Sequence, residues 1–285
     1  MLRVFLLFSL IAIPGFAVDK AASDQVTELF KQRRWAEAQA ILEKVTVTEP
    51  NEAPAWFFLG QALLAQNNAE KSVSALEKAT GLAPTNSEYQ RILGDAYGLN
   101  ALKAGLLAKM GWAKKCKAAY DKSIELDPKN IRARMSVMEF CRQAPGFLGG
   151  GMDKAYAQAE EIKKLDVVRG RQAYATLYAA EKKYPEAFAV YEDVLREKPG
   201  DDDALYNIGR LAAISGQQLD RGLDTLKELL SHPGKDKDAR VHTRIGNILE
   251  KKGDKAGAKS AYETALAGDP KFVQALEALR KLNAG

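Results

Sequence analysis

A motif of small and large residues recurs in this chain at a spacing of 34 residues, and it constrains the fold more than any other feature. The first copy reads Trp56-x2-Leu59-Gly60-x2-Leu63, then Ser72-x3-Leu76-x2-Ala79-x4-Pro84. The same pattern returns near the C-terminus as His242-x2-Ile245-Gly246-x2-Leu249, then Ala258-x3-Tyr262-x2-Ala265-x4-Pro270. Repetition at this period predicts a chain of helix–turn–helix units that stack on one another.

The proline residues place further copies of the motif. Pro50 and Pro84 are 34 positions apart, and Pro84 and Pro128 are 44 apart, which is one period plus ten residues. The intervals from Pro128 to Pro199 and from Pro199 to Pro270 are both 71 residues, or two periods plus three. We place the ten extra residues between the two helices of the third unit. The predicted units span about 19–52, 53–86, 87–130, 131–167, 168–201, 202–238 and 239–272, and a capping helix covers 271–285.

Side-chain size explains why such units pack. Small residues, above all Gly60, Gly94, Gly209 and Gly246, let two antiparallel helices approach closely. Large residues fill the gap toward the neighbouring unit; these are Trp56, Leu76, Tyr120, Tyr191 and Tyr262. One unit cannot bury its own apolar face, so stacking supplies the core. We therefore predict an all-α protein, a right-handed α-solenoid (superhelix) of about seven units with a C-terminal capping helix.

The motif resembles the tetratricopeptide repeat in its period, its paired helices and its residue types. The resemblance covers the chain from about residue 19 onward, and two insertions in the repeat make the chain look like a group of exported bacterial repeat proteins. It implies a non-catalytic scaffold that holds a protein or peptide partner in a concave groove, with envelope assembly, secretion or transport as the expected settings. The alternative is an exported component that encloses a small ligand or a lipid. A closed apolar cavity would favour this alternative, and an open charged groove would favour a protein partner.

The first 17 residues read MLRVFLLFSLIAIPGFA. An early arginine, an apolar run, Pro14 and the small residues Gly15 and Ala17 are typical of a signal peptide cleaved between Ala17 and Val18. The alternative is an uncleaved N-terminal anchor, although the run is shorter than the roughly 20 residues that span a bilayer. We expect a mature chain, 18–285, that is exported to the periplasm or secreted and has no stable membrane span.

Composition gives little support for other functions. The chain carries 42 basic and 37 acidic residues, interleaved as on solvated helix surfaces, so we expect no nucleic-acid partner. His232 and His242 are the only histidines, and no metal, nucleotide or nucleophile motif is present. We predict no catalytic residues, no metal site and no cofactor. Cys116 and Cys141 fall on inward positions of adjacent units, where they form a disulfide or remain two buried thiols.

Two segments depart from the repeat. Residues 98–115 are apolar and basic, so they form either a protruding partner- or membrane-binding element or two longer helices that pack on each other. Residues 144–151 contain three consecutive glycines before Asp153. They form either an anion-binding loop or a connection whose following helix is capped by Asp153.

The resemblance also implies which residues contact a partner, because tetratricopeptide repeats use defined positions of the first helix of each unit. Arginine dominates those positions here, which favours an acidic peptide or a C-terminal carboxylate. Asn207, Arg240 and Arg244 resemble half of a carboxylate clamp, whereas Gln172 and Thr176 replace the lysine and asparagine of the other half. The alternative is a basic surface that is only hydrated. The candidate residues are Arg91, Arg132, Arg142, Arg169, Gln172, Tyr206, Asn207, Arg210, Arg240, Arg244 and Asn247.

Overall fold

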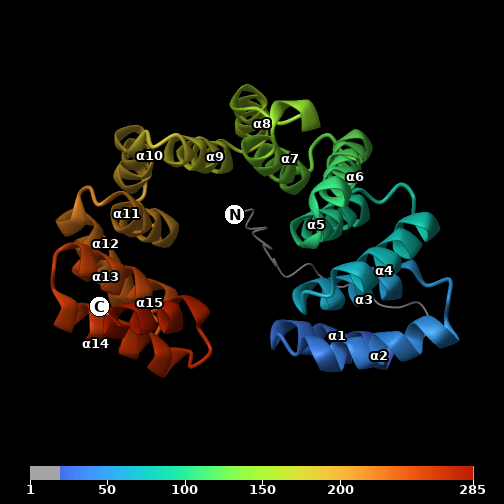
Figure 1. Cartoon of the computed structure of the whole chain (residues 1–285), viewed down its shortest axis with the longest axis horizontal. Coiled ribbons are helices and arrows are strands. Elements are labelled where there is room, and N and C mark those ends of the chain that lie inside the picture. Colours follow the sequence, from blue (N-terminus) through green and yellow to red (C-terminus); the bar gives the residue numbers. More distant parts are fainter. Residues whose placement is uncertain (1–19, 285) are drawn as a thin grey trace. The chain divides into compact units, whose positions relative to one another are not determined.

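The computed structural model describes residues 20–284, so the predicted signal peptide lies outside the described residues. Fifteen α-helices and one short 3-10 helix account for the secondary structure of this part, which contains no strand (Figure 1). The predicted all-α fold is confirmed.

The chain divides into two compact units at Val167 and Val168. The helices of the first are α1 (Lys20–Lys31), α2 (Trp35–Thr48), α3 (Ala53–Ala65), α4 (Ala69–Leu82), α5 (Ser87–Lys103), α6 (Leu106–Leu126), α7 (Ile131–Gln143), the 3-10 helix η1 (Gly146–Leu148) and α8 (Met152–Leu165). Those of the second are α9 (Val167–Ala180), α10 (Tyr184–Glu197), α11 (Asp202–Ser215), α12 (Leu219–Ser231), α13 (Ala239–Lys251), α14 (Lys255–Gly268) and α15 (Val273–Ala284).

Short polar side chains begin several of these helices. The carboxylate or amide oxygen of the N-cap residue accepts a hydrogen bond from a backbone N–H of the first turn, which has no partner within the helix. Asp201 accepts from the N–H of Ala204 at 3.0 Å. The other N-caps of this kind are Asn86, Asn130, Asp238 and Asp254. Local sequence therefore fixes where these helices start.

Glycine on the first helix and a large side chain on the second form a recurring contact. A Cβ atom on Gly94 would lie 2.4 Å from the Tyr120 ring, and one on Gly246 would lie 2.4 Å from the Tyr262 ring. The same arrangement pairs Gly60 with Leu76 and Gly209 with Leu226. The sequence had assigned Leu76, Tyr120 and Tyr262 to the gap between neighbouring units. The structure adds a contact that the assignment did not include, because these three side chains fill the space above a glycine in their own unit.

Each compact unit has its own apolar interior. In the second unit the core includes Phe188, Leu205, Ile208, Leu211, Leu226 and Ile248. A small cluster formed by Ala239, Ala265 and Ala275, with Leu266 and Phe272 beside it, attaches α15 to the end of this unit. In the first unit, Phe30 packs edge to face on Phe58, and Phe57 stacks on Tyr89, with ring centroids 5.6 Å and 4.2 Å apart. Successive helix pairs are thus joined by aromatic and aliphatic contacts, as stacking requires.

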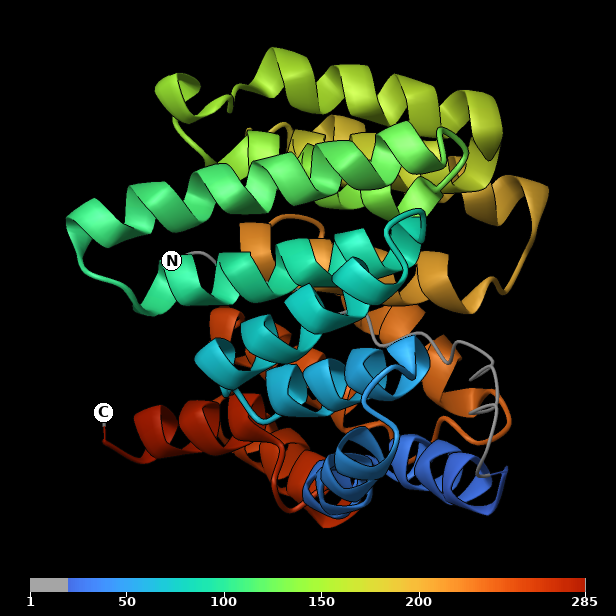
Figure 2. The same cartoon turned by 90° about the vertical axis from the view of Figure 1, so that its right-hand side faces the viewer.

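The insertion in the third predicted unit lengthens the helices. The first helix, α5, has 17 residues and the second, α6, has 21, with only residues 104 and 105 between them. The extra residues therefore lengthen both helices, as one of the two alternatives from the sequence had it, and form no long loop between them. Figure 2 shows the two green helices of this hairpin extending past the ends of α3 and α4.

The glycine-rich segment in the fourth predicted unit is a hydrogen-bonded turn. The backbone N–H groups of Gly149, Gly150 and Gly151 donate to the carbonyl oxygens of Gly146, Pro145 and Cys141, at 2.9, 3.2 and 2.8 Å respectively. No N–H of these three glycines is left to bind an anion, so the anion-binding interpretation was wrong. The N-cap of α8 is Gly151, with φ of 137°, and Asp153 lies in the first turn. The capping role predicted for Asp153 was also wrong.

Candidate partner-binding surface

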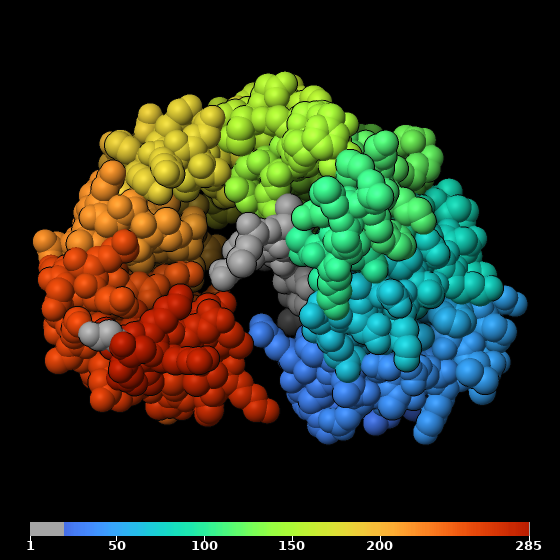
Figure 3. Space-filling view, viewed as in Figure 1, coloured from blue at the N-terminus to red at the C-terminus, as the bar shows by residue number. Residues whose placement is uncertain are grey.

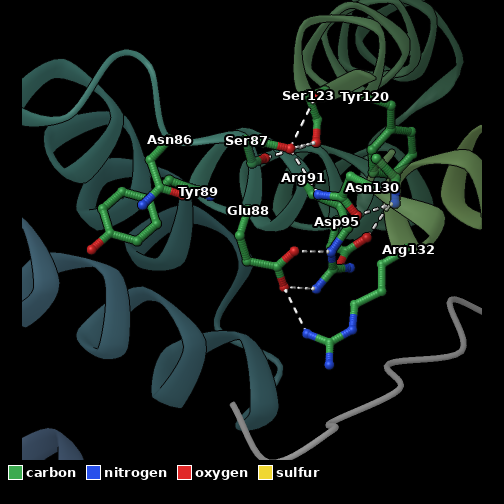
Figure 4. A network of polar contacts seen from close by, with 11 residues as sticks. Asn86, Ser87, Glu88, Tyr89, Arg91, Asp95, Tyr120, Ser123, Asn130 and Arg132 are labelled. Atoms are coloured by element: carbon green, nitrogen blue, oxygen red, sulfur yellow. Dashed lines mark hydrogen bonds and ion pairs between the residues drawn. The ribbon is translucent and has the colours of Figure 1, made fainter. Parts of the chain in front are cut away.

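Arg91, the first predicted contact residue, is buried in α5 and is 8% exposed. Its Nε and Nη2 atoms donate to the two carboxylate oxygens of Glu88 at 2.9 and 2.7 Å, and Nη1 donates to Asp95 Oδ2 at 2.9 Å (Figure 4). A guanidinium held by two carboxylates inside the protein is not available to a partner. Arg91 therefore does not belong to the candidate surface.

The Arg91 network continues from α5 into α6. The Tyr120 hydroxyl donates to Asp95 Oδ1 at 2.7 Å. Burial raises the pKa of Asp95, and the neighbouring Arg91 and Tyr120 oppose this rise by stabilising the carboxylate. Burial, with a smaller contribution from Asp95, raises the pKa of the nearby Cys116 thiol to about 12. These contacts hold the two long helices together and point to a structural role.

Arg132 and Arg142, on α7, both lie near carboxylates. Arg132 Nη1 is 3.6 Å from Glu88 Oε1, at the edge of the network in Figure 4. Arg142 Nε donates to Glu139 Oε2 at 2.8 Å, within the same helix, and this hydrogen bond raises the pKa of Arg142. Intramolecular carboxylates therefore already balance part of the charge that sequence analysis had assigned to a ligand.

In the second compact unit, the predicted residues fall on three helices. Arg169 and Gln172 are on α9, where Arg169 is exposed and Gln172 is partly buried. The other six are on α11 and α13, which pack against each other. We call these six the α11–α13 surface: Tyr206, Asn207 and Arg210 from α11, and Arg240, Arg244 and Asn247 from α13.

One contact joins the two halves of the α11–α13 surface. The Arg240 guanidinium carbon lies 5.6 Å from the centroid of the Tyr206 ring. Such a cation–π contact fixes the position of a long exposed side chain. Arg240 also donates to Asp238 Oδ2 at 2.6 Å, which raises the pKa of Arg240. Burial raises the pKa of Asp238, but the hydrogen bond and charge of Arg240, together with the backbone N–H groups of Arg240 and Val241, outweigh it and leave that pKa lowered. Arg240 therefore has its own counter-ion.

Arg210 and Arg244 differ from the other arginines. Arg210 Nε donates to the amide oxygen of Asn207 at 2.9 Å. Arg244 Nη1 lies 3.3 Å from the amide oxygen of Asn247, in the amide orientation in which the Asn247 nitrogen donates to the Tyr262 hydroxyl. Within residues 20–284, neither arginine has an ion pair with a carboxylate. Neutral amides hold both guanidinium groups in place while leaving their charge unbalanced.

The two histidines have defined hydrogen-bond partners. His242 Nε2 donates to the backbone oxygen of Asp236 at 2.7 Å. At the equivalent fourth position of α3 and α7, Trp56 Nε1 and Arg134 Nε donate to the carbonyl oxygens of Pro50 and Pro128, six residues earlier in each case. A side-chain donor at this position thus ties the first helix to the preceding turn. Sequence analysis placed His242 at the motif position of Trp56 but did not find this hydrogen bond.

His232 is the second histidine, and it lies beside a helix start. Its Nδ1 is 2.6 Å from Asp202 Oδ1, and Lys235 Nζ is 2.9 Å from Asp202 Oδ2. These hydrogen bonds lower the pKa of Asp202.

Within the described chain, no three His, Cys, Asp or Glu side chains gather as metal ligands would. No helix in residues 20–284 has the length and apolar character of a membrane span.

Cys116 and Cys141 are both buried free thiols in the structure. The Cys141 sulfur donates to the carbonyl oxygen of Gly149 at 3.7 Å, within the turn before α8. The sequence allowed either a disulfide or two buried thiols, and the structure has two buried thiols. A disulfide between Cys116 and Cys141 stays a prediction to be tested.

Comparison with known proteins supports the repeat assignment. Family models for the tetratricopeptide repeat match residues 29–96, 97–130 and 239–272, just under half of the chain. The chain therefore carries tetratricopeptide repeats, and its fold is that of a class of protein-interaction scaffolds that are generally not enzymes.

Solved structures with the same fold come from distant organisms. A tetratricopeptide repeat protein from Parabacteroides merdae has a TM-score of 0.65 at 15% identity, over 93% of this chain and 98% of that one. Yeast Tom70 has a TM-score of 0.69 at 12% identity, over 97% of this chain and 59% of that one. At these identities the likeness concerns the fold alone.

One curated relative is similar in sequence. Cellulose synthase operon protein C of Pseudomonas fluorescens is 31% identical over 103 residues, which are 34% of this chain. The matched part is 8% of the length of that protein. The similarity is thus between a few repeats of two chains that differ greatly in size.

Proposed function

We propose that this protein is an exported scaffold that binds an acidic peptide segment, or the C-terminus of a partner protein, on the α11–α13 surface. The observation that carries the proposal is the state of Arg210 and Arg244. Both are held by asparagine amides and have no carboxylate partner within the described residues. A peptide carboxylate can supply the missing charge through hydrogen bonds from the guanidinium groups.

The rest of the surface suits an extended peptide. Arg240, held against the Tyr206 ring, forms a flat platform beside the two arginines, and aromatic and arginine side chains dominate binding energy at protein interfaces. The surface is charged, which supports a protein partner over the small-ligand or lipid alternative.

Export and the cellular role, the other two parts of the proposal, do not rest on the α11–α13 surface. Export rests on residues 1–17, whose composition is typical of a signal peptide. A role in envelope assembly, secretion or transport follows from export together with an interaction scaffold. The similarity to cellulose synthase operon protein C covers too little of that protein to transfer cellulose synthesis to this one.

The test is a titration of the chain from Val18 onward with two fluorescent peptides, followed by anisotropy. One peptide is acidic with a free C-terminus, and the other has amides in place of its carboxylates. We expect tighter binding of the acidic peptide, and a roughly tenfold or greater loss in the double variant Arg210→Ala with Arg244→Ala.

Arg221→Ala is the matched control, because Arg221 lies in the same compact unit but already pairs with Glu192 at 2.8 Å. It should bind the acidic peptide as the parent does. Equal binding of both peptides, unchanged by the double variant, would contradict the proposal.

A further inference from the structure

Two leucines at the start of α6 are exposed. Leu106 is 78% and Leu107 is 82% exposed, and both belong to the first turn of the helix. They lie at the turn of the α5–α6 hairpin, which we call the hairpin tip and define as residues 103–115. One alternative from the sequence was two longer helices that pack on each other, and the other was a protruding partner- or membrane-binding element. The exposure of Leu106 and Leu107 does not fit packing between the helices and is compatible with the second alternative.

The neighbouring residues of the hairpin tip are packed. Met110 and Trp112 are partly buried, and the Trp112 ring lies 5.8 Å from that of Tyr97 on α5. Lys115 Nζ covers both rings, at 5.0 Å from Trp112 and 5.3 Å from Tyr97. The leucines therefore project from an ordered helix pair. They are exposed because the hairpin is longer than its neighbours, and no other helix of residues 20–284 covers them.

The charge around the leucines has one sign. Residues 98–120 contain five lysines and no acidic residue. Lys103 donates to the carbonyl oxygen of Asn67, and Lys117 pairs with Asp121 at 2.6 Å. Lys109 and Lys114 are exposed, and the described chain offers neither of them an ion-pair partner. The N-terminus of α6 adds positive potential, because no side chain caps the N–H groups of its first turn and no acidic residue lies there.

The side chains of the tip offer no hydrogen-bond acceptor oxygen. Residues 104–111 are Ala, Gly, Leu, Leu, Ala, Lys, Met and Gly, and none of these side chains carries an oxygen atom. Apolar side chains flanked by lysines match a lipid surface, because its acyl chains are apolar and its phosphates carry negative charge. Figure 3 shows the green end of the hairpin at the surface of the first compact unit, on the face toward the viewer.

We propose that the hairpin tip docks on an anionic lipid bilayer, with Leu106 and Leu107 inserted among the headgroups and Lys109 and Lys114 against the phosphates. This inference does not depend on the peptide-binding function. A scaffold anchored in this way would present its partner next to the membrane while remaining a peripheral protein.

The experiment measures co-sedimentation of the chain from Val18 onward, which retains every described residue, with two kinds of vesicle. One kind is phosphatidylcholine alone, and the other contains phosphatidylcholine and phosphatidylglycerol in equal amounts. We expect binding to the anionic vesicles that weakens as salt is added. The double variant Leu106→Ser with Leu107→Ser should reduce it roughly tenfold or more. Lys109→Gln with Lys114→Gln should weaken it and reduce its salt dependence.

Val47→Ser is the matched control, because Val47 on α2 is also exposed, at 81%, but lies outside the tip. It should bind as the parent does, and circular dichroism should show all variants folded. Equal binding to both vesicles, or the same loss in Val47→Ser, would overturn the proposal. A dimer in size-exclusion chromatography that the leucine variant dissociates, without vesicle binding, would also overturn it and assign the leucines to a second copy of the chain.

Discussion

The side chain of Leu76 occupies the space directly above Gly60. A Cβ atom on Gly60 would lie 2.4 Å from Leu76 Cγ, and the Ser72 hydroxyl donates to the carbonyl oxygen of Gly60 at 2.9 Å. The first helix of the unit therefore approaches the second at a distance that admits no side chain at this position.

Gly60→Ala should lower the free energy of unfolding by about 1–3 kcal/mol, as overpacking does, even though alanine is the better helix former. Gly81→Ala, in the second helix of the same unit, is the control because a Cβ there meets no atom within 4 Å. That change should raise stability by up to about 1 kcal/mol. Urea denaturation measures both, and a similar sign for the two variants would contradict the close-approach argument.

Loss of Arg91 should be far more costly than loss of Arg132. Arg91→Ala leaves the Asp95 carboxylate buried without its cation, and we expect a destabilisation of about 3–5 kcal/mol. Arg132→Ala removes only a 3.6 Å contact at a partly exposed site and should cost less than about 1 kcal/mol. Adding Asp95→Asn to Arg91→Ala should recover part of the loss, because the unpaired charge is removed. Equal destabilisation by the two arginine variants would contradict the argument, because the buried ion pairs of Arg91 would then contribute no more to stability than the exposed contact of Arg132.

Asp238 should make stability depend on pH in the acid range. Its pKa in the folded protein is lower than the usual value of 3.8, so the carboxylate stabilises the fold fully above pH 3.8. That contribution is lost as the pH falls through the lower, folded-state pKa. Asp238→Asn keeps an oxygen that caps α13 but loses the charge. We expect it to be less stable than the parent at neutral pH by about 0.5–1 kcal/mol.

The difference between Asp238→Asn and the parent should shrink to nothing below the folded-state pKa, as thermal unfolding over a pH series would show. Asp236→Asn changes an exposed carboxylate in the same loop and should give a difference that is small at every pH. If the stability difference between Asp238→Asn and the parent were the same at every pH, the effect would come from the helix cap and not from the carboxylate charge.

The two cysteines should behave as unreactive buried thiols. With a pKa of about 12, the Cys116 thiol is ionised in on the order of one molecule in 10⁴ at pH 8, and burial blocks access as well. A thiol reagent should therefore label neither cysteine quickly in the native protein. After denaturation without a reducing agent, it should label two. Finding none at that stage would establish a disulfide between Cys116 and Cys141 instead.

Sequence periodicity was sufficient for the helices and for the close glycine contacts, because both follow from local propensity and from residue size at fixed spacing. It was insufficient for the candidate surface. Arg91 and Arg244 were both predicted contact residues on the first helices of their units, yet Arg91 is buried. The difference arises because Glu88 and Asp95 flank Arg91 on its own helix and both pair with it. The Tyr120 hydroxyl, from a residue 25 positions after Asp95, donates a further hydrogen bond to Asp95. A carboxylate at both i−3 and i+4 was the available sign that this arginine was already paired.

The turn before α8 shows a second limit. Three consecutive glycines looked equally suitable for binding an anion and for connecting two helices, because the sequence does not show where backbone N–H groups donate. The carbonyl oxygens of Gly146, Pro145 and Cys141 receive all three. Only the folded backbone decides between these two uses of the same residues.

The donors at the fourth position of α3, α7 and α13 have a consequence for how such chains diverge. An indole, a guanidinium and an imidazole make the same hydrogen bond to the carbonyl six residues earlier. Selection at this position can therefore preserve a hydrogen bond while the residue that makes it changes freely. Comparison by residue identity would score the position as variable, although its role in anchoring each helix to the preceding turn is the same in all three.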